Sequence, residues 1–145
     1  MQCYGFTRRC QFYKDPSWSK LKYPNNWAVK NLFGIKTARR VLLAGNVFEN
    51  CWAEAQRGYA SVLKSSSPSL GRTRDTTSDV TIRYNRIINC LNGIAIARWS
   101  SRGPVTPGAE PTSRILVEHI VRGRATGPRE QRPMERIPAL RSMPS

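Results

Sequence analysis

Two copies of a six-residue pattern constrain the fold of this chain more than any other feature. Residues 46–51 read Asn-Val-Phe-Glu-Asn-Cys, and residues 85–90 read Asn-Arg-Ile-Ile-Asn-Cys. The copies lie 39 residues apart, and each follows a short run of strand-forming residues. A strand and its turn that recur together predict a stacked repeat, in which equivalent residues lie above one another.

Weaker copies extend the repeat in both directions. Residues 10–12 match residues 46–48 at an offset of 36, and residues 113–119 match the second copy at an offset of 35. Unequal offsets indicate one winding unit with loops of different length. Apolar residues alternate in the same phase in each copy, which predicts strands with apolar side chains pointing inward. The predicted strands are 32–36, 41–44, 58–63, 80–83, 93–97 and 113–119.

The rest of the chain reads as loops and a tail. Residues 64–78 are polar and turn-rich, so we expect an exposed loop, and residues 99–112 contain three prolines and read as a second loop. From residue 122 the chain is rich in arginine and proline, and such a segment buries too little apolar surface to offset its ordering entropy. We therefore predict an N-terminal extension (1–9), a repeat segment (10–121) and a disordered basic tail (122–145).

The charge of the chain is strongly positive, at +15. A high pI is one mark of nucleic-acid binding, but the arginines are scattered, without a stripe at helical spacing or an aromatic pattern typical of RNA recognition. We expect no specific nucleic-acid partner, although a basic nucleic-acid-binding protein stays the third alternative. No apolar run approaches the roughly 20 residues that cross a bilayer, and no signal peptide is visible.

The four cysteines do not form a metal-binding pattern. There is no C-x-x-C pair and only one histidine, so we expect no zinc site. Cys51 and Cys90 occupy the same place in the repeat, one layer apart. Layers spaced by roughly 4.7–4.9 Å fall within the Cα range of a disulfide, about 4.4–6.8 Å. A disulfide and a pair of buried free thiols are both compatible with this placement.

Residues 29–33, 38–42, 45–50 and 52–56 carry a resemblance to a known family. They resemble the right-handed parallel β-helix repeat proteins of the pectate-lyase-like superfamily, above all large secreted bacterial members of unassigned function. The resemblance covers roughly residues 10–121. It implies an all-β solenoid of three to four partial coils, an extracellular or periplasmic location, and a polysaccharide as partner.

In the implied fold, Asn46 and Asn85 belong to an asparagine ladder at a tight turn. Asparagine takes left-handed backbone angles at low cost, and its amide can bond the layer above. Further structural columns are expected at Asn50 and Asn89 and at Cys51 and Cys90. The ladder breaks near Ile120, and the arginine-rich tail replaces further strands. We therefore expect a fragment or a shifted reading frame, with coil ends whose bare strand edges favour association.

The sequence offers little sign of chemistry. Glycosidases need two carboxyl groups about 5–10 Å apart, and of the nine carboxylates only Asp75 and Asp79 flank one loop, a spacing typical of turns. His119 has no partner pattern, and no nucleophile motif or phosphate loop is present. We expect no catalytic, metal-binding or cofactor-binding residue in this chain, and we expect the chain to have a structural role. The alternative is that it is part of a polysaccharide lyase or glycoside hydrolase whose active residues lie elsewhere. Trp52, Tyr59 and Trp99 offer flat faces for sugar stacking if they lie outside; the alternative is that these aromatic residues fold over the wall of the repeat.

Overall fold

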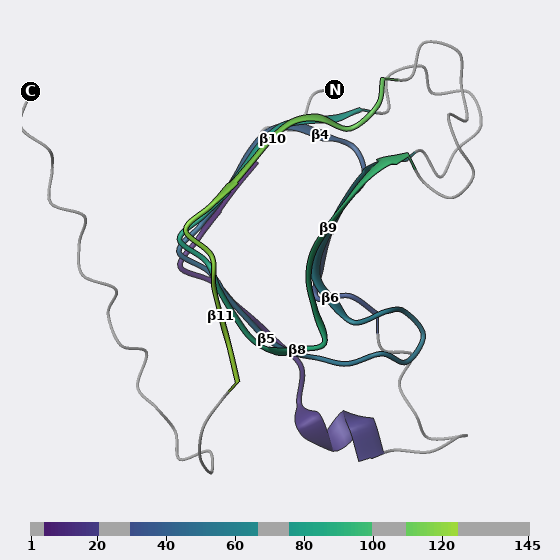
Figure 1. Ribbon diagram of the computed structural model, residues 1–145, viewed down its shortest axis with the longest axis vertical. Helices are drawn as coiled ribbons and strands as arrows, with labels where there is room; N and C mark the ends of the chain where they lie inside the picture. Colours follow the sequence, from purple (N-terminus) through teal and green to yellow (C-terminus); the bar gives the residue numbers. More distant parts are fainter. Residues whose placement is uncertain (1–4, 21–29, 67–75, 100–109, 125–145) are drawn as a thin grey trace, which may run out of the picture.

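The computed structural model describes residues 5–20, 30–66, 76–99 and 110–124. Nearly all regular structure in these residues is β-strand, arranged in three parallel sheets (Figure 1). The prediction of an all-β chain with parallel strands is confirmed. The described helix is the short 3-10 helix η1 (Pro16–Lys20), and no helix in the described ranges has the length and apolar character needed to cross a membrane.

The chain visits the three sheets in a fixed order. Sheet A contains, in spatial order, β1 (Gly5–Arg8), β4 (Ala38–Ala44), β7 (Thr77–Arg83) and β10 (Ser113–Glu118). Sheet B contains β2 (Gln11–Tyr13), β5 (Val47–Cys51), β8 (Arg86–Cys90) and β11 (Val121–Gly123). Sheet C contains β3 (Phe33–Ile35), β6 (Tyr59–Ser65) and β9 (Asn92–Trp99). Each passage from sheet A through sheet B to sheet C forms one layer, and successive layers overlie one another in Figure 1.

The register of the sheets follows the sequence repeat. In sheet A, Val80 pairs with Val41 on one side and with Ile115 on the other. In sheet B, Cys51 pairs with Cys90. Equivalent residues thus form columns, by which we mean residues paired in register through successive strands. The offsets of 36, 39 and 35 are those of the three strand pairs in sheet B.

The core consists of two apolar clusters between the sheets. One contains the inward residues of sheets A and C, among which Leu43 and Leu63 are fully buried. The other is centred on Phe48, whose ring stacks on Phe12 at 4.9 Å and 7°. The rings of Phe33 and Phe12 pack edge to face, with their centroids 5.1 Å apart. Full burial of one such side chain contributes about 1.5–3 kcal/mol, so these columns supply the main force that holds the layers together.

Both predicted boundaries of the repeat segment differ from the strands. Strand β1 lies inside the predicted N-terminal extension, because Gly5 pairs with Val41 and extends sheet A by one strand. At the other end, β11 continues two residues past the predicted limit, since Gly123 pairs with Ile88. Residues 125–145, most of the tail that the sequence predicts to be disordered, lie outside the described residues.

Two other expectations need correction. The repeated motif is mainly strand rather than turn, since residues 47–51 form β5 and the corner lies just before them. The loop predicted over residues 64–78 is shorter, because Thr77 and Ser78 open strand β7 and are fully buried together with Thr76. The hydroxyls of Thr77 and Ser78 donate to the Lys64 carbonyl and to Asp79 Oδ2, which allows these two polar residues to be buried.

Candidate functional site

The asparagines at the corner between sheets A and B form a hydrogen-bonded ladder. The backbone N–H of Asn46 donates to Asn85 Oδ1 at 2.8 Å, and Asn46 Nδ2 donates to the same oxygen at 3.0 Å. One layer earlier, Asn46 Oδ1 accepts from the Cys10 N–H at 3.0 Å, and Asn46 Nδ2 donates to the Thr7 carbonyl at 2.9 Å. Asn85 Nδ2 donates to the Leu43 carbonyl at 2.9 Å. Both side chains are buried and bond the neighbouring layer.

The left-handed conformation at this corner lies one residue before each ladder asparagine, contrary to the sequence expectation. Positive φ occurs at the equivalent residue of all four layers: Arg9 (54°), Gly45 (65°), Tyr84 (54°) and His119 (50°). Asn46 and Asn85 themselves have no positive φ. The ladder position therefore requires the asparagine amide, and the preceding residue makes the turn.

A second asparagine pair lies at the far end of sheet B. Asn50 and Asn89 have φ of 62° and 51°, so the left-handed argument applies here. Asn50 Nδ2 donates to the Lys14 carbonyl at 3.1 Å, and Asn89 Nδ2 donates to Asn50 Oδ1 at 3.3 Å. This pair also links successive layers.

The two cysteines that pair in register are free thiols. Burial raises the pKa of the Cys51 thiol and raises that of Cys90 to about 12. Cys51 Sγ lies 3.3 Å from the Tyr59 carbonyl, and Cys90 Sγ lies 3.5 Å from the Ile88 carbonyl. A protonated, buried thiol is a poor nucleophile, so these cysteines pack as small apolar side chains.

The three aromatic residues selected for sugar stacking do not form one platform. Trp52, Tyr59 and Trp99 are all half-buried. Tyr59 opens β6 and Trp99 closes β9, so they lie at opposite ends of sheet C. Trp52 follows β5, and its backbone packs so closely on Gly58 that a Cβ there would lie 2.6 Å from the Trp52 carbonyl carbon. Of the three, Trp52 lines a hollow of the described surface.

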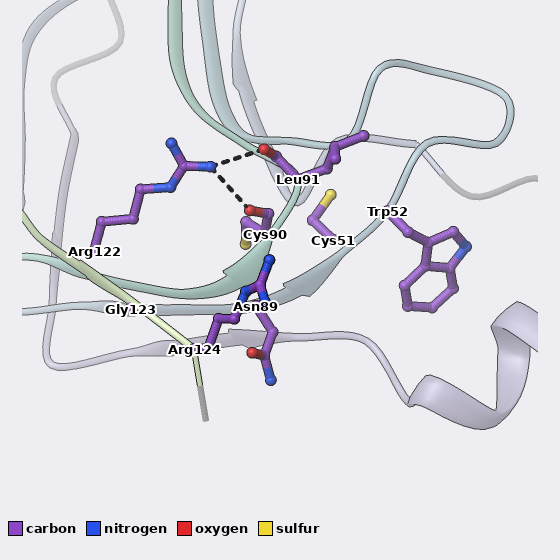
Figure 2. Close-up of a pocket in the computed structure, with 8 residues that line it drawn as sticks. All are labelled: Cys51, Trp52, Asn89, Cys90, Leu91, Arg122, Gly123 and Arg124. Atoms are coloured by element: carbon purple, nitrogen blue, oxygen red, sulfur yellow. Dashed lines mark hydrogen bonds between the residues drawn. The ribbon is translucent and has the colours of Figure 1, made fainter. Parts of the chain in front are cut away.

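That hollow, of about 610 Å³, lies at the junction of sheets B and C. Its lining includes Trp52, Asn89, Arg122 and Arg124. Arg122 Nη2 donates to the carbonyl of Leu91 at 2.8 Å and to that of Cys90 at 3.3 Å, which orients its side chain. Figure 2 shows Arg122 and Trp52 on opposite sides of the two cysteines. The arrangement combines an aromatic residue with two cations and an amide.

Two surface contacts were missed from the sequence. Tyr84 and His119 stack at 4.7 Å, with Arg83 Cζ 5.8 Å from the Tyr84 ring centroid. Asp79 pairs with Arg114, whose Nη2 lies 2.9 Å from Asp79 Oδ2. Hydrogen bonding from Arg114, helped by Ser78, lowers the pKa of Asp79 to about 2. The Asp79–Arg114 pair could have been predicted, because the two residues lie 35 positions apart, the same offset that separates the last two copies of the repeat.

Other described carboxylates make structural contacts. Glu110 pairs with Arg39 at 3.0 Å, and Asp15 Oδ1 accepts from the Ser17 N–H at 2.8 Å. Glu118 lies beside Arg83 in register, as the repeat predicts, and its Oε2 lies 3.9 Å from His119 Nδ1. Asp75, the second carboxylate considered for a loop pair, lies outside the described residues, as do Glu130 and Glu135. In the part of the chain that the structure describes, no three such side chains cluster as metal ligands.

No family model, no curated protein and no solved structure matches this chain.

Proposed function

We propose that the chain is a segment of a right-handed parallel β-helix that acts as a structural scaffold and binds an extracellular polysaccharide. The Asn46–Asn85 ladder carries the scaffold part of this proposal, because its buried amides are fully engaged in joining layers. The fixed order in which the chain visits its three parallel sheets supports the same fold. The resemblance of the repeat to pectate-lyase-like β-helix proteins supports an extracellular glycan as ligand.

The hollow beside Trp52 is the proposed glycan contact. An indole presents a flat apolar face together with an N–H donor, a combination suited to a sugar ring. Arg122 and Arg124 are permanently charged and can bind a carboxylate through paired N–H groups. Pockets that bind small ligands combine such an apolar wall with a few polar groups. The chemistry therefore fits a polysaccharide that contains uronate units.

Titration calorimetry of the full chain with a polyuronate and with a neutral glucan tests this proposal. We expect saturable binding of the polyuronate, weakened about tenfold by Trp52→Ala because the stacking face is lost. Arg124→Gln should weaken polyuronate binding and leave any glucan binding unchanged. Trp99→Ala is the matched control, because Trp99 closes β9 and is not among the residues that line the hollow. This variant should bind the polyuronate like the wild type.

Salt and product measurements separate the alternatives. Contact through charge alone would disappear at moderate salt and extend equally to DNA, because exposed charges are screened beyond about 8–10 Å. Equal effects of Trp52→Ala and Trp99→Ala would contradict the site. Release of unsaturated oligosaccharides from the polyuronate would contradict the non-catalytic role and indicate a lyase.

A further inference from the structure

The outer strands of sheets A and B provide two matching ends. Within the described residues, β1 and β10 are the outer strands of sheet A, and β2 and β11 are those of sheet B. An outer strand leaves a row of N–H and C=O groups that another strand can bond. All the pairings are parallel. Strands β1 and β2 of a second copy could therefore continue both sheets past β10 and β11 without reversing direction.

We propose that β10 and β11 of one molecule bind β1 and β2 of a second copy, head to tail and in the register of the internal layers. This association does not depend on glycan binding. The columns that run through the molecule determine which residues would meet across the contact.

The outward apolar column of sheet A supports this pairing. It runs through Phe6, Leu42, Thr81 and Leu116. Its two end members are conspicuously exposed, Phe6 at 78% and Leu116 at 50%. Continuing the column places Phe6 of the second copy beside Leu116 of the first. The contact would remove both side chains from water, and cross-strand apolar pairs of this kind stabilise a sheet.

The next outward column supplies matching charges. It runs through Arg8, Ala44, Arg83 and Glu118. Continuing it places Arg8 of the second copy beside Glu118 of the first, an opposite-charge pair of the kind that fixes register between strands. Carboxylates are few in this strongly basic chain. The position of Glu118 at the end of a column that begins with Arg8 therefore favours this particular pairing.

Inward columns also fit a second copy. Arg122 pairs with Ile87 and therefore lies in the column of Phe48 and Phe12. Phe12 of the second copy would lie beside the Arg122 side chain, where a cation–π contact can form. Val117 ends another inward column and is 38% exposed. A following layer would cover its apolar surface.

The contact would produce open chains of molecules. Its two faces differ, so each copy keeps one free end after binding, and repetition of the contact gives a filament rather than a closed ring. Sheet C has three described strands against four in sheets A and B. The proposed contact is accordingly made by sheets A and B.

Sedimentation velocity of the full chain over a range of concentrations tests the association. We expect the average sedimentation coefficient of the wild type to rise with concentration. The apparent affinity of self-association should fall about tenfold or more in Arg8→Glu and in Glu118→Arg, because like charges then meet at the contact. An equimolar mixture of the two variants should associate again, because each end then meets its opposite. Arg8→Glu is the cleaner variant, since its neighbour within the chain is Ala44. Circular dichroism checks that each variant is folded.

A matched pair of apolar variants tests the register. Leu116→Ser should weaken association. Leu91→Ser removes a similarly exposed leucine, at 56%, outside sheets A and B, and it should not. Equal effects of these two variants, or charge variants that change nothing, would overturn the proposed contact.

A cross-link gives a second readout. Cys10, Asn46, Asn85 and Ile120 occupy the same corner in successive layers, where backbone bonds join Cys10 to Val47, Asn46 to Arg86 and Asn85 to Val121. Ile120 would therefore lie one strand spacing from Cys10 of the next copy. Under oxidation, Ile120→Cys should give a disulfide-linked series of multimers, since adjacent strands fall within disulfide range. The series should vanish in Ile120→Cys with Cys10→Ser. A folded chain that stays monomeric at every concentration and forms no such multimers would overturn the proposal and leave these edges for another partner.

Discussion

The two corners of sheet A achieve the same burial of polar groups in different ways. The corner toward sheet B uses one residue type, because Asn46 and Asn85 each supply a donor and an acceptor to an adjacent layer. The corner toward sheet C uses hydroxyls. Thr77 N–H donates to Ser65 Oγ at 2.9 Å, and Ser65 N–H donates to Thr112 Oγ1 at 2.7 Å. These two bonds of the hydroxyl corner thus use different donors and acceptors.

The two corners differ in how completely their buried polar groups are hydrogen-bonded. An amide has two polar atoms and can bond two groups at once, whereas a hydroxyl must share one oxygen. The asparagine ladder is satisfied at both described members. At the hydroxyl corner, the buried Thr76 Oγ1 has no hydrogen-bond partner among the described residues. We therefore expect the loss of Asn85 to cost more than any substitution at the hydroxyl corner.

The largest effect is expected for Asn85→Leu. This change removes the acceptor of both the Asn46 N–H and the Asn46 amide, and the donor to the Leu43 carbonyl. Unsatisfied buried groups cost about 1–3 kcal/mol each and do not add fully. We expect a loss of about 3–5 kcal/mol in the free energy of unfolding, measured by urea denaturation.

The internal control is Asn46→Leu. Two of its lost partners, the Cys10 N–H and the Thr7 carbonyl, lie in the first layer, where Cys10 is exposed. The third, Asn85 Oδ1, still accepts from the backbone N–H of residue 46. Water can replace these bonds, so the loss should be smaller, about 2 kcal/mol. If Asn46→Leu were the more costly variant, the order of the ladder inferred here would be wrong.

An intermediate effect is expected for Ser65→Ala. The substitution leaves the buried Thr77 N–H without its acceptor. One unsatisfied amide at a corner costs about 1–2 kcal/mol. Urea denaturation should show a lower midpoint at an unchanged m-value. A loss as large as that of Asn85→Leu would remove the contrast between the two corners.

The smallest effect has the opposite sign. Thr76→Val keeps the branched shape of a 2% exposed side chain and removes the hydroxyl that has no described partner. Removing an unpaired buried polar group should stabilise the fold by about 1 kcal/mol. The midpoint of thermal unfolding should rise by a few degrees. A destabilised variant would indicate that Oγ1 has a bonding partner after all.

Repetition also determined how much of the fold could be predicted. Columns of like residues, such as Val41 with Val80 or Cys51 with Cys90, are visible in the sequence because the same residue type recurs at the repeat offset. From them the strands of sheets A and C, apart from β1, and the stacking of the layers follow. The strands of sheet B do not, because the motif that forms β5 and β8 reads as a turn. The two ladder asparagines could be selected for the same reason.

Positions without such recurrence could not be predicted. Thr76 and Thr77 read as loop because isolated hydroxyl residues favour turns, and their burial depends on partners in other layers. The turn at Tyr84 was missed because the left-handed residue changes from layer to layer. The hollow beside Trp52 depends on Arg122, which the sequence assigned to the disordered tail.

The paired thiols of Cys51 and Cys90 have a practical consequence. Burial raises the pKa of both, that of Cys90 to about 12, so in the folded chain neither is a reactive thiolate near neutral pH. Opening of the adjoining layers would return them to ordinary thiol acidity. Their rate of alkylation by an added reagent therefore reports how often the middle of the molecule opens, without an engineered cysteine.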